Sequence, residues 1–509
     1  MLLHQLLTQW NTKEKTALIY GSKHYKYTEL FHLNSIISNN LYQYGVRKNT
    51  HVALFMDNRP ELISLYFAIF NLGAVAIPIN YRYKTDELAY VFHDCQINIL
   101  ITEESKEPFI EKLFQREKLD CKIFSISNHV NQIFMNFTSL LHKETPPYPQ
   151  QKITQDDLGV ILYTSGSTSN PKGVMHSHHS ILAAATNLTQ TIMLDSDCIN
   201  AISLPICHIA GMVGQVISTI LVGGQMVLLP KFDAESLIYA IEQHQVTHLQ
   251  MTPVNLLELV EYASTKKINL NSLRLVMVGG DKVPEILQEK FFALGHCYVT
   301  EVLGMTESFS YCINLSHDKK KLGSIGKPAK GVTIDLLDDH NHIIKNNKQI
   351  GEIRVCSEAN MMGYWQNPHE TVASLRDGCI YTGDLAYRDQ DGFFWFAGRK
   401  KQLIIRGGSN ISPQEVENVL IHHPLIHEIC IIGYPDKKFN QIVCACIVLK
   451  DKTSALSLDD IRRFCKDHIS DYKIPEKLIV FEELPHNALY KFDRNKIYQM
   501  ALTMDDHTL

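Results

Sequence analysis

The sequence YTSGSTSNPKG, from Tyr163 to Gly173, directly follows the apolar run 160–162. The run predicts a buried strand, and the small, hydroxyl-rich residues after it predict a loop. Small residues let the backbone approach a ligand closely, and successive N–H groups can bind phosphate oxygens. The loop's candidate phosphate contacts are Thr164, Ser165, Gly166, Ser167, Thr168 and Lys172. Pro171 excludes the Walker pattern, so the loop alone fits a phosphate site or a polar surface loop.

Short apolar runs alternate with helical stretches on both sides of this loop. Expected strands are 52–55, 97–101, 226–229 and 273–278, and expected helices are 61–70, 234–244 and 284–294. The alternation predicts an α/β fold with much parallel sheet. A linker composition at 143–152 precedes the loop, and a boundary near Lys400 leaves a unit of ordinary domain size at the end.

Composition narrows the class of protein. A chain of 509 residues with 45% apolar and 20% charged residues predicts a globular protein of at least two domains. The formal net charge of −5 argues against a general polyanion surface, so no nucleic-acid partner is expected. Twelve cysteines include no C-x-x-C pair, which argues against a zinc site. We expect free thiols, no disulfides and a cytoplasmic location.

Two segments bear on membranes and targeting. The first fifteen residues lack a basic leader followed by a long apolar region, so we expect no secretory signal. The uncharged stretch 62–81 is long enough to span a bilayer, but Asn71 and Gly73 interrupt it. A buried helix, a turn and a buried strand explain this stretch better, so no transmembrane segment is expected.

The phosphate loop resembles the signature of the adenylate-forming superfamily, which includes acyl-CoA and aryl-CoA ligases. Further motifs follow in the family's order, from about Tyr20 to Arg494. The resemblance implies a large N-terminal domain of stacked mixed sheets and helices, 1–399. It also implies a small C-terminal α+β domain, 400–509, hinged to the first.

The motif LGMTES, Leu303 to Ser308, resembles the family's Y-G-x-T-E motif. By this resemblance Thr306 contacts phosphate and Glu307 holds Mg²⁺, which prefers carboxylate and phosphate oxygens. The motif GGDKVP resembles the loop that lines the adenine and acyl pocket. These two motifs assign the nucleotide-binding residues Gly279, Gly280, Asp281, Leu303, Gly304 and Met305.

Three later motifs complete the resemblance. In YTGD and GR, Asp384 is expected to bind both ribose hydroxyls, and Arg399 the ribose or phosphate. In GRKKQLIIRGGSNISPQEVE, Lys401 is the hinge, and Gly407 and Gly408 line the coenzyme A tunnel. In ELPHNALYKFDR, Lys491 bridges the acyl carboxylate and the α-phosphate, where two anions must be brought together.

This chain departs from the family pattern at three positions. Ser169 replaces the second glycine of the phosphate loop, and Leu303 replaces a tyrosine that packs on adenine. Tyr490 replaces the glycine before Lys491, which bears on the delivery of that lysine because glycine permits backbone angles that tyrosine resists. In LPICHIAG, His208 is the candidate acyl-pocket residue, with a hydrogen-bonded core histidine as the alternative.

The resemblance implies an ATP-dependent carboxylic acid–CoA ligase. The acid forms acyl-AMP and pyrophosphate with MgATP, and coenzyme A then displaces AMP; a fatty or aromatic acid is favoured. An acyl-AMP ligase that loads a carrier-protein thiol is one alternative, although the uninterrupted run 401–417 favours coenzyme A. A degenerate ligand-binding member and a light-producing oxygenase are others. The oligomeric state is open, and a homodimer is compatible with the sequence.

Overall fold

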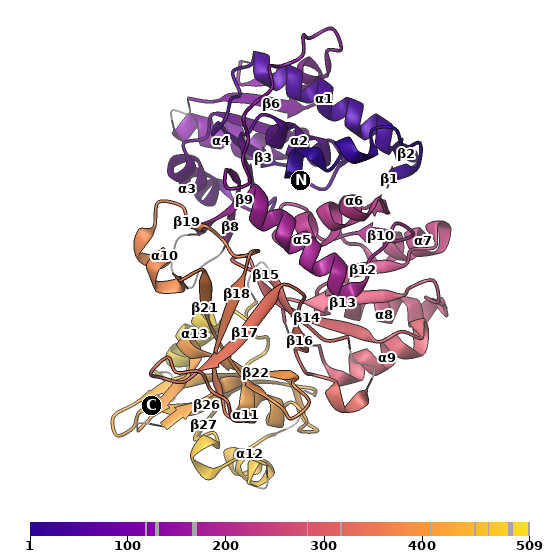
Figure 1. Cartoon of the computed structure of the whole chain (residues 1–509). Coiled ribbons are helices and arrows are strands. Elements are labelled where there is room, and N and C mark those ends of the chain that lie inside the picture. Colours follow the sequence, from indigo (N-terminus) through magenta and orange to yellow (C-terminus); the bar gives the residue numbers. More distant parts are fainter. Residues whose placement is uncertain are drawn as a thin grey trace. The chain divides into compact units, whose positions relative to one another are not determined.

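The computed structural model describes residues 1–117, 120–127, 132–164, 171–281, 283–315, 318–407, 409–451, 453, 455–466, 468–486 and 492–506. The chain divides into two compact units (Figure 1). The first comprises Met1–Ile334 and Val355–Tyr381, and the second comprises Asp335–Arg354 and Thr382–Leu509. The second unit thus includes segments that precede Lys400. The predicted division into domains 1–399 and 400–509 refers to parts that rotate about a hinge at Lys401, and it stays a prediction.

Two large sheets form the framework of the first unit. In the described residues, one sheet has the order β16 (Lys327–Pro328), β15 (Phe309–Ile313), β14 (Val299–Met305), β13 (Leu275–Gly279), β12 (His248–Met251), β10 (Ile199–Ile202), β11 (Gln225–Leu228), β1 (Thr16–Tyr20) and β2 (Lys23–Lys26). The other has the order β19 (Gly363–Tyr364), β9 (Lys172–Ser177), β8 (Leu158–Thr164), β4 (Val75–Pro78), β3 (His51–Phe55), β5 (Ile99–Glu103), β6 (Lys122–Ile126) and β7 (Phe134–Asn136). Most central pairs are parallel, as predicted.

Helices cover both faces of these sheets. The helices of the first unit are α1 (Tyr27–Gln43), α2 (Pro60–Asn71), α3 (Thr85–Cys95), α4 (Glu107–Arg116), α5 (His178–Ile192), α6 (Ser218–Val222), α7 (Ala234–His244), α8 (Pro253–Lys266), α9 (Glu285–Gly295) and α10 (Pro368–Ser374), with a π-helix at Ala210–Ile217. Helices α1, α2 and α5 share one apolar core with both sheets. Helices α7 to α9 cover the outer face of the first sheet, and α3 and α4 that of the second (Figure 1).

The uncharged stretch 62–81 forms a buried helix, a turn and a buried strand, as predicted. Helix α2 is buried along almost its whole length, and β4 follows after a turn at Gly73. Its residues pack in the core between the two sheets or against β3 and β8. Among the described helices, none combines the length and apolar character that crossing a bilayer requires.

A smaller sheet with three helices forms the core of the second unit. The sheet has the order β24 (Ser409–Ile411), β23 (Ile404–Arg406), β26 (Asn440–Leu449) and β25 (Ile426–Asp436), with β27 (Lys477–Val480) beside β26. Its helices are α11 (Pro413–Leu420), α12 (Leu458–Cys465) and α13 (Arg494–Asp506). Cys444 and Cys446 are buried on one face of β26. The predicted α/β class, with a large first and a small second part, is confirmed.

A further sheet is formed within residues 332–399. Its order is β17 (Val332–Leu337), β18 (Gly351–Ser357), β21 (Cys379–Arg388) and β20 (Leu375–Arg376), with β22 (Phe394–Arg399) paired to β21. Cys356 and Cys379 lie on neighbouring strands and form a disulfide, so the expectation of free thiols alone is wrong for this pair. Their separation of 23 residues carries no sequence signal, because only strand pairing brings the two Cα atoms to 4.2 Å. Ten other cysteines are free.

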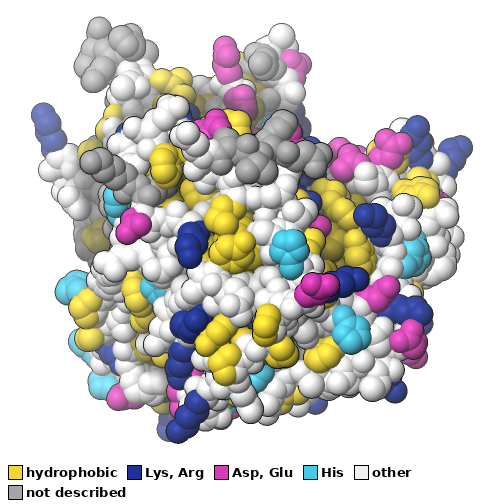
Figure 2. Space-filling view, turned by 90° about the horizontal axis from the view of Figure 1, so that it is seen from above, with side chains coloured by type: hydrophobic (Ala, Val, Ile, Leu, Met, Phe, Trp, Pro, Cys, Tyr) yellow, Lys and Arg dark blue, Asp and Glu magenta, His cyan; other side chains and the backbone are white. Residues whose placement is uncertain are grey.

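On the face seen in Figure 2, charge is spread rather than concentrated. Basic and acidic side chains are interspersed there, with hydrophobic side chains between them. This pattern agrees with the small net charge of −5.

Candidate functional site

The phosphate-loop motif lies on an antiparallel hairpin. Strand β8 ends at Thr164, strand β9 begins at Lys172, and these two residues face each other in the register. The hairpin brings the two ends of the predicted loop, Thr164 and Lys172, together. Ser165, Gly166, Ser167 and Thr168 lie outside the described residues, as does Ser169.

Lys172 is held in place by two groups from a later segment. Its Nζ forms an ion pair with Glu370 of α10, and it lies 5.4 Å from the centre of the Tyr364 ring. The side chain of Lys172 is only 15% exposed. A cation over an aromatic face and beside a carboxylate is fixed in position, so a phosphate group would share or replace Glu370 as its partner.

The Thr306-Glu307 pair occupies the turn between β14 and β15. The Tyr364 hydroxyl donates to Oε1 of Glu307 at 2.7 Å, and burial beside that carboxylate raises the pKa of Tyr364. The backbone N–H of Met361 donates to the Glu307 carbonyl at 2.8 Å. Tyr364 therefore lies between the two predicted phosphate-site groups, Lys172 and Glu307.

A buried histidine from a strand of the other large sheet fixes the same turn. Nε2 of His176, on β9, lies 2.8 Å from the carbonyl oxygen of Thr306. Burial lowers the pKa of His176 to about 4, so the ring is neutral at pH 7. Nε2 must carry its proton to donate to this carbonyl, and Nδ1 then faces the Ser180 hydroxyl at 3.1 Å. The turn is thus anchored to the hairpin that carries Lys172.

The other predicted nucleotide contacts lie at the carboxyl ends of two parallel strands. Gly279 ends β13 and pairs with Val302 of β14, so Gly280 and Asp281 follow at the level of Leu303 and Gly304. Met305 is the last residue of β14. The φ angle of Gly280 is +94°, which a side chain would resist. Ligands of open α/β sheets bind at this edge, so the placement suits a nucleotide.

His208 precedes the π-helix of the first unit. Its backbone N–H donates to Pro205, and its carbonyl accepts from Met212, which fixes the start of the π-helix. Burial, with a smaller contribution from Arg82, lowers the pKa of His208 to about 4. The ring is therefore neutral at pH 7 and suits a wall of a binding pocket better than a charged partner for a carboxylate.

Asp384 and Arg399 face each other on strands of the second unit. They are a register pair of β21 and β22, and the Arg399 Nε lies 2.9 Å from Asp384 Oδ1. Asp384 is 4% exposed, whereas the Arg399 side chain is 57% exposed. The backbone of Asp384 is held as well, because its N–H donates to the Thr382 hydroxyl at 3.0 Å. The structure brings together the two predicted ribose contacts.

The predicted hinge and tunnel residues follow directly. Lys401 is exposed in a short 3-10 helix, Lys400–Gln402, whose Lys400 pairs with Glu352 at 2.9 Å. Gly407 has φ +53° and donates to the Phe439 carbonyl at 2.8 Å. Gly408 and Lys491, with its neighbour Tyr490, lie outside the described residues. Their predicted roles stay predictions.

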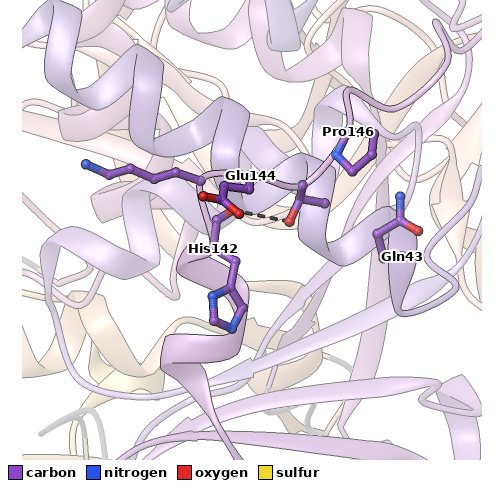
Figure 3. A pocket seen from close by; sticks show the side chains of 6 residues that line it. Gln43, His142, Glu144 and Pro146 are labelled. Atoms are coloured by element: carbon purple, nitrogen blue, oxygen red, sulfur yellow. Dashed lines mark hydrogen bonds between the residues drawn. The ribbon is translucent and has the colours of Figure 1, made fainter.

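A surface pocket lies elsewhere in the first unit. The pocket is lined by Gln43, at the end of α1, by His142 and by residues 143–146 of the linker (Figure 3). The linker is fixed there because the Thr145 hydroxyl donates to Asn40 Oδ1 at 2.6 Å. The lining shares no residue with the predicted site, so we assign this pocket no role in the chemistry.

Sequence reasoning missed three residues that hold the predicted ones. Tyr364 and Glu370 contact Glu307 and Lys172, and His176 binds the Thr306 carbonyl. The tyrosine is 57 positions from Glu307, and Glu370 is 198 positions from Lys172. The one local signal is Asn367-Pro368, which marks the start of α10 but does not indicate what Glu370 contacts.

Comparisons with known proteins agree with this geometry. Residues 8–365 match the family described as AMP-binding enzyme, and residues 415–491 match the AMP-binding enzyme C-terminal domain. Indoleacetate–CoA ligase of Aromatoleum aromaticum is 29% identical over 96% of this chain and 95% of its own. The ATP-bound structure of MatB from Rhodopseudomonas palustris superposes with a TM-score of 0.88 at 26% identity, covering 98% and 99% of the two chains. The structure of o-succinylbenzoate CoA synthetase (MenE) from Bacillus subtilis with its acyl-adenylate intermediate gives 0.84 at 29% identity, covering 97% of each.

These matches show that the protein is an adenylate-forming enzyme with an N-terminal and a C-terminal domain. The chain belongs to the AMP-binding enzyme family. The predicted superfamily, fold and enzyme class, an acid–thiol ligase, are therefore confirmed.

Proposed function

We propose that this chain activates a fatty or aromatic carboxylic acid with MgATP and transfers the acyl group to coenzyme A. The observation that carries the proposal is the network in which Tyr364 lies between Lys172 and Glu307. In this network Lys172 offers a cation to phosphate oxygens and Glu307 offers a carboxylate to a divalent metal, and both residues belong to the first unit. Acid–CoA ligases among the relatives support the same reaction.

The reaction proceeds in two steps. A carboxylate oxygen of the acid attacks the α-phosphorus of ATP, the bond from that phosphorus to the bridging oxygen breaks, and pyrophosphate leaves. The coenzyme A sulfur, as thiolate, then attacks the acyl carbon, and the bond to the AMP oxygen breaks. We assign Lys172, Thr306 and the loop hydroxyls to the phosphates, and Lys491 to the reacting carboxylate and α-phosphate.

The donor set at the turn fits magnesium. Glu307 offers a hard carboxylate oxygen, and Mg²⁺ takes one or two carboxylates together with phosphate oxygens. Tyr364 engages Oε1 of that carboxylate and so orients Oε2. When bound, the ion would neutralise phosphate charge, while Glu307 and Tyr364 keep its carboxylate ligand in one orientation.

The ribose and acceptor assignments rest on the second unit. A carboxylate such as Asp384 can accept from two ribose hydroxyls while Arg399 contacts the ribose or phosphate. Strands β23 and β24 are joined by a tight turn at Gly407 and lead straight into α11. The shortness of this segment favours coenzyme A over a carrier protein. The ten free cysteines support a cytoplasmic location, whereas the single Cys356–Cys379 disulfide does not.

A panel of carboxylic acids tests the proposal. Purified protein is incubated with ATP, Mg²⁺ and coenzyme A, and AMP release and the thioester are followed by chromatography and mass spectrometry. We expect at least one fatty or aromatic acid to give equal amounts of AMP and acyl-CoA. AMP release that needs the acid but gives no thioester with coenzyme A would refute the acceptor and favour a carrier-protein thiol.

A further inference from the structure

A buried glutamine lies behind the segment that carries His208. Gln250 is on β12 and faces the core between the two sheets, beside its register partner Met277. The residue is 7% exposed, and its Oε1 has no hydrogen-bond partner in the part of the chain that the structure describes. Leaving a buried amide oxygen unpaired costs free energy, so such an atom needs a functional or structural reason.

Gly214 of the π-helix lies directly beside this oxygen, and Phe309 lies beside Gly214. A Cβ built on Gly214 of the π-helix would lie 2.4 Å from Gln250 Oε1 and 3.1 Å from Cζ of Phe309. Glycine at 214 therefore lets the helix approach the amide. Phe309 has φ +59°, a strained value for an aromatic residue, and it follows Glu307 by two positions. Strained backbone and π-helical turns both cluster at functional sites.

The depth of Gln250 below the sheet edge sets what it can reach. Gln250 pairs with Met277, two residues before Gly279, where the predicted nucleotide loop begins. At about 3.3 Å per residue, Gln250 lies roughly 7 Å below that edge. An acyl group that extends from the edge between the π-helix and the sheet would bring its distal end to Gln250, not its carboxylate.

Gln215, a second buried glutamine nearby, has a side-chain amide that hydrogen bonds hold in place. Gln215, in the π-helix, donates from Nε2 to the Ala201 carbonyl at 2.9 Å and to Asn200 Oδ1 at 3.3 Å. These bonds tie the π-helix to β10 and give Gln215 a structural role. Oε1 of Gln215 also lacks a partner among the described residues, so the two glutamines differ in their Nε2 bonds. In the described part of the chain no hydrogen bond holds the Gln250 side chain, which leaves its acceptor to a ligand.

We propose that Gln250 determines which acid is used: its Oε1 accepts a hydrogen bond from a donor at the distal end of the acyl group. The preferred substrate is then a carboxylic acid that carries a hydroxyl, ring N–H or amino group away from its carboxylate. This inference rests on the proposed function and sharpens it. A site built around a buried acceptor rejects the analogue that lacks the donor, because the acceptor is then left unpaired.

Matched acids that differ only in the donor test this inference. One pair is indole-3-acetate and benzofuran-3-acetate, and the other is 3-(4-hydroxyphenyl)propanoate and 3-(4-methylphenyl)propanoate. For each acid, MgATP-dependent pyrophosphate exchange gives kcat/KM for adenylation. In the wild-type protein we expect the donor-bearing member of at least one pair to be favoured by about tenfold or more.

Gln250→Met, which keeps the volume but removes the acceptor, should bring that ratio close to one. Gln288→Met is the matched control, because Gln288 is a buried glutamine with an unpaired Oε1 on α9, away from the π-helix. The control should keep the wild-type ratio. If Gln250→Met does not fold, Gln250→Asn, with a shorter reach, carries the same test.

The outcomes separate this inference from the proposed function. Exchange in which the wild type favours the donor-free acids, or in which Gln250→Met keeps the wild-type ratio, overturns the inference and leaves the ligase activity intact. Exchange with no acid of any kind overturns the proposed function, and the inference with it.

Discussion

The Tyr364 hydroxyl donates a 2.7 Å hydrogen bond to Oε1 of Glu307, while the ring of the same tyrosine lies 5.4 Å from the Lys172 ammonium. One side chain thus contacts the carboxylate proposed for magnesium and the lysine proposed for phosphate. Because all three residues lie in the first unit, their relative positions do not depend on the second unit.

Tyr364→Phe keeps the ring under Lys172 but removes the donor to Glu307. Mutation of a residue that hydrogen-bonds a metal ligand typically lowers metal affinity by roughly ten- to a hundredfold. We therefore expect the Mg²⁺ concentration for half-maximal pyrophosphate exchange to rise by about tenfold or more. Tyr27→Phe removes another buried hydroxyl, which donates to Gly224, and should leave the Mg²⁺ requirement unchanged. An unchanged requirement in Tyr364→Phe would show that Tyr364 does not orient Glu307.

Asp384→Asn tests the ribose assignment through the nucleotide rather than through the acid. Wild-type protein should use ATP much better than 2′-deoxy-ATP, because in our proposal the buried carboxylate accepts from both ribose hydroxyls. The variant should lose most of this preference and show a KM for ATP raised by about tenfold. Asp335→Asn, which alters a pair with Arg354 in the same unit, serves as the control. If Asp384→Asn fully kept the preference for ATP over 2′-deoxy-ATP, Asp384 would not be the residue that binds the ribose.

Lys491→Ala separates the two half-reactions. Loss of the positive charge between two anions should lower acyl-AMP formation by at least about a hundredfold. Thioester formation from supplied acyl-AMP should be largely retained, because that step does not join two anions at this lysine. Lys496→Ala, at an exposed position of α13, should affect neither step. Normal adenylation by Lys491→Ala would refute the assignment.

Lys401→Pro tests the hinge. Proline fixes φ near −65° and restricts the residue before it, so a rotation about this position would be blocked. We expect thioester formation to fall much more than adenylation. Lys401→Ala removes the side chain without fixing φ and should have the smaller effect. Equal loss of both steps in a folded Lys401→Pro protein would mean that Lys401 is not the pivot.

The fold could be predicted because its signals are local. Apolar runs of four to six residues and helical spacing located β3, β5, β11, β13, α2, α7 and α9 within a few residues. The order of strands could not be predicted, because β1 pairs with β11 from more than two hundred residues away. The Cys356–Cys379 disulfide was missed for the same reason: it depends on pairing between strands, not on spacing in the sequence.

The candidate site was predicted to the extent that it lies in motifs. Asp384 and Arg399 belong to separate motifs, and the structure pairs them on β21 and β22. Tyr364, Glu370 and His176 lie outside the motifs that were used, and their importance follows only from what they touch. The sequence does not distinguish a tyrosine that packs in a core from one that hydrogen-bonds a site carboxylate. Tertiary contacts were therefore needed to identify Tyr364.

Tyr490 supplies the sharpest test of whether the chain catalyses adenylation at all. The decisive measurement is MgATP-dependent exchange of labelled pyrophosphate into ATP by the wild-type protein, without coenzyme A, across a broad panel of carboxylic acids. The account predicts exchange that requires one of these acids, and it predicts that Tyr490→Gly exchanges at the same or a higher rate, with a modest loss of stability. Absence of exchange with every acid in the wild type, together with gain of exchange in Tyr490→Gly, would contradict the account and identify a disabled enzyme.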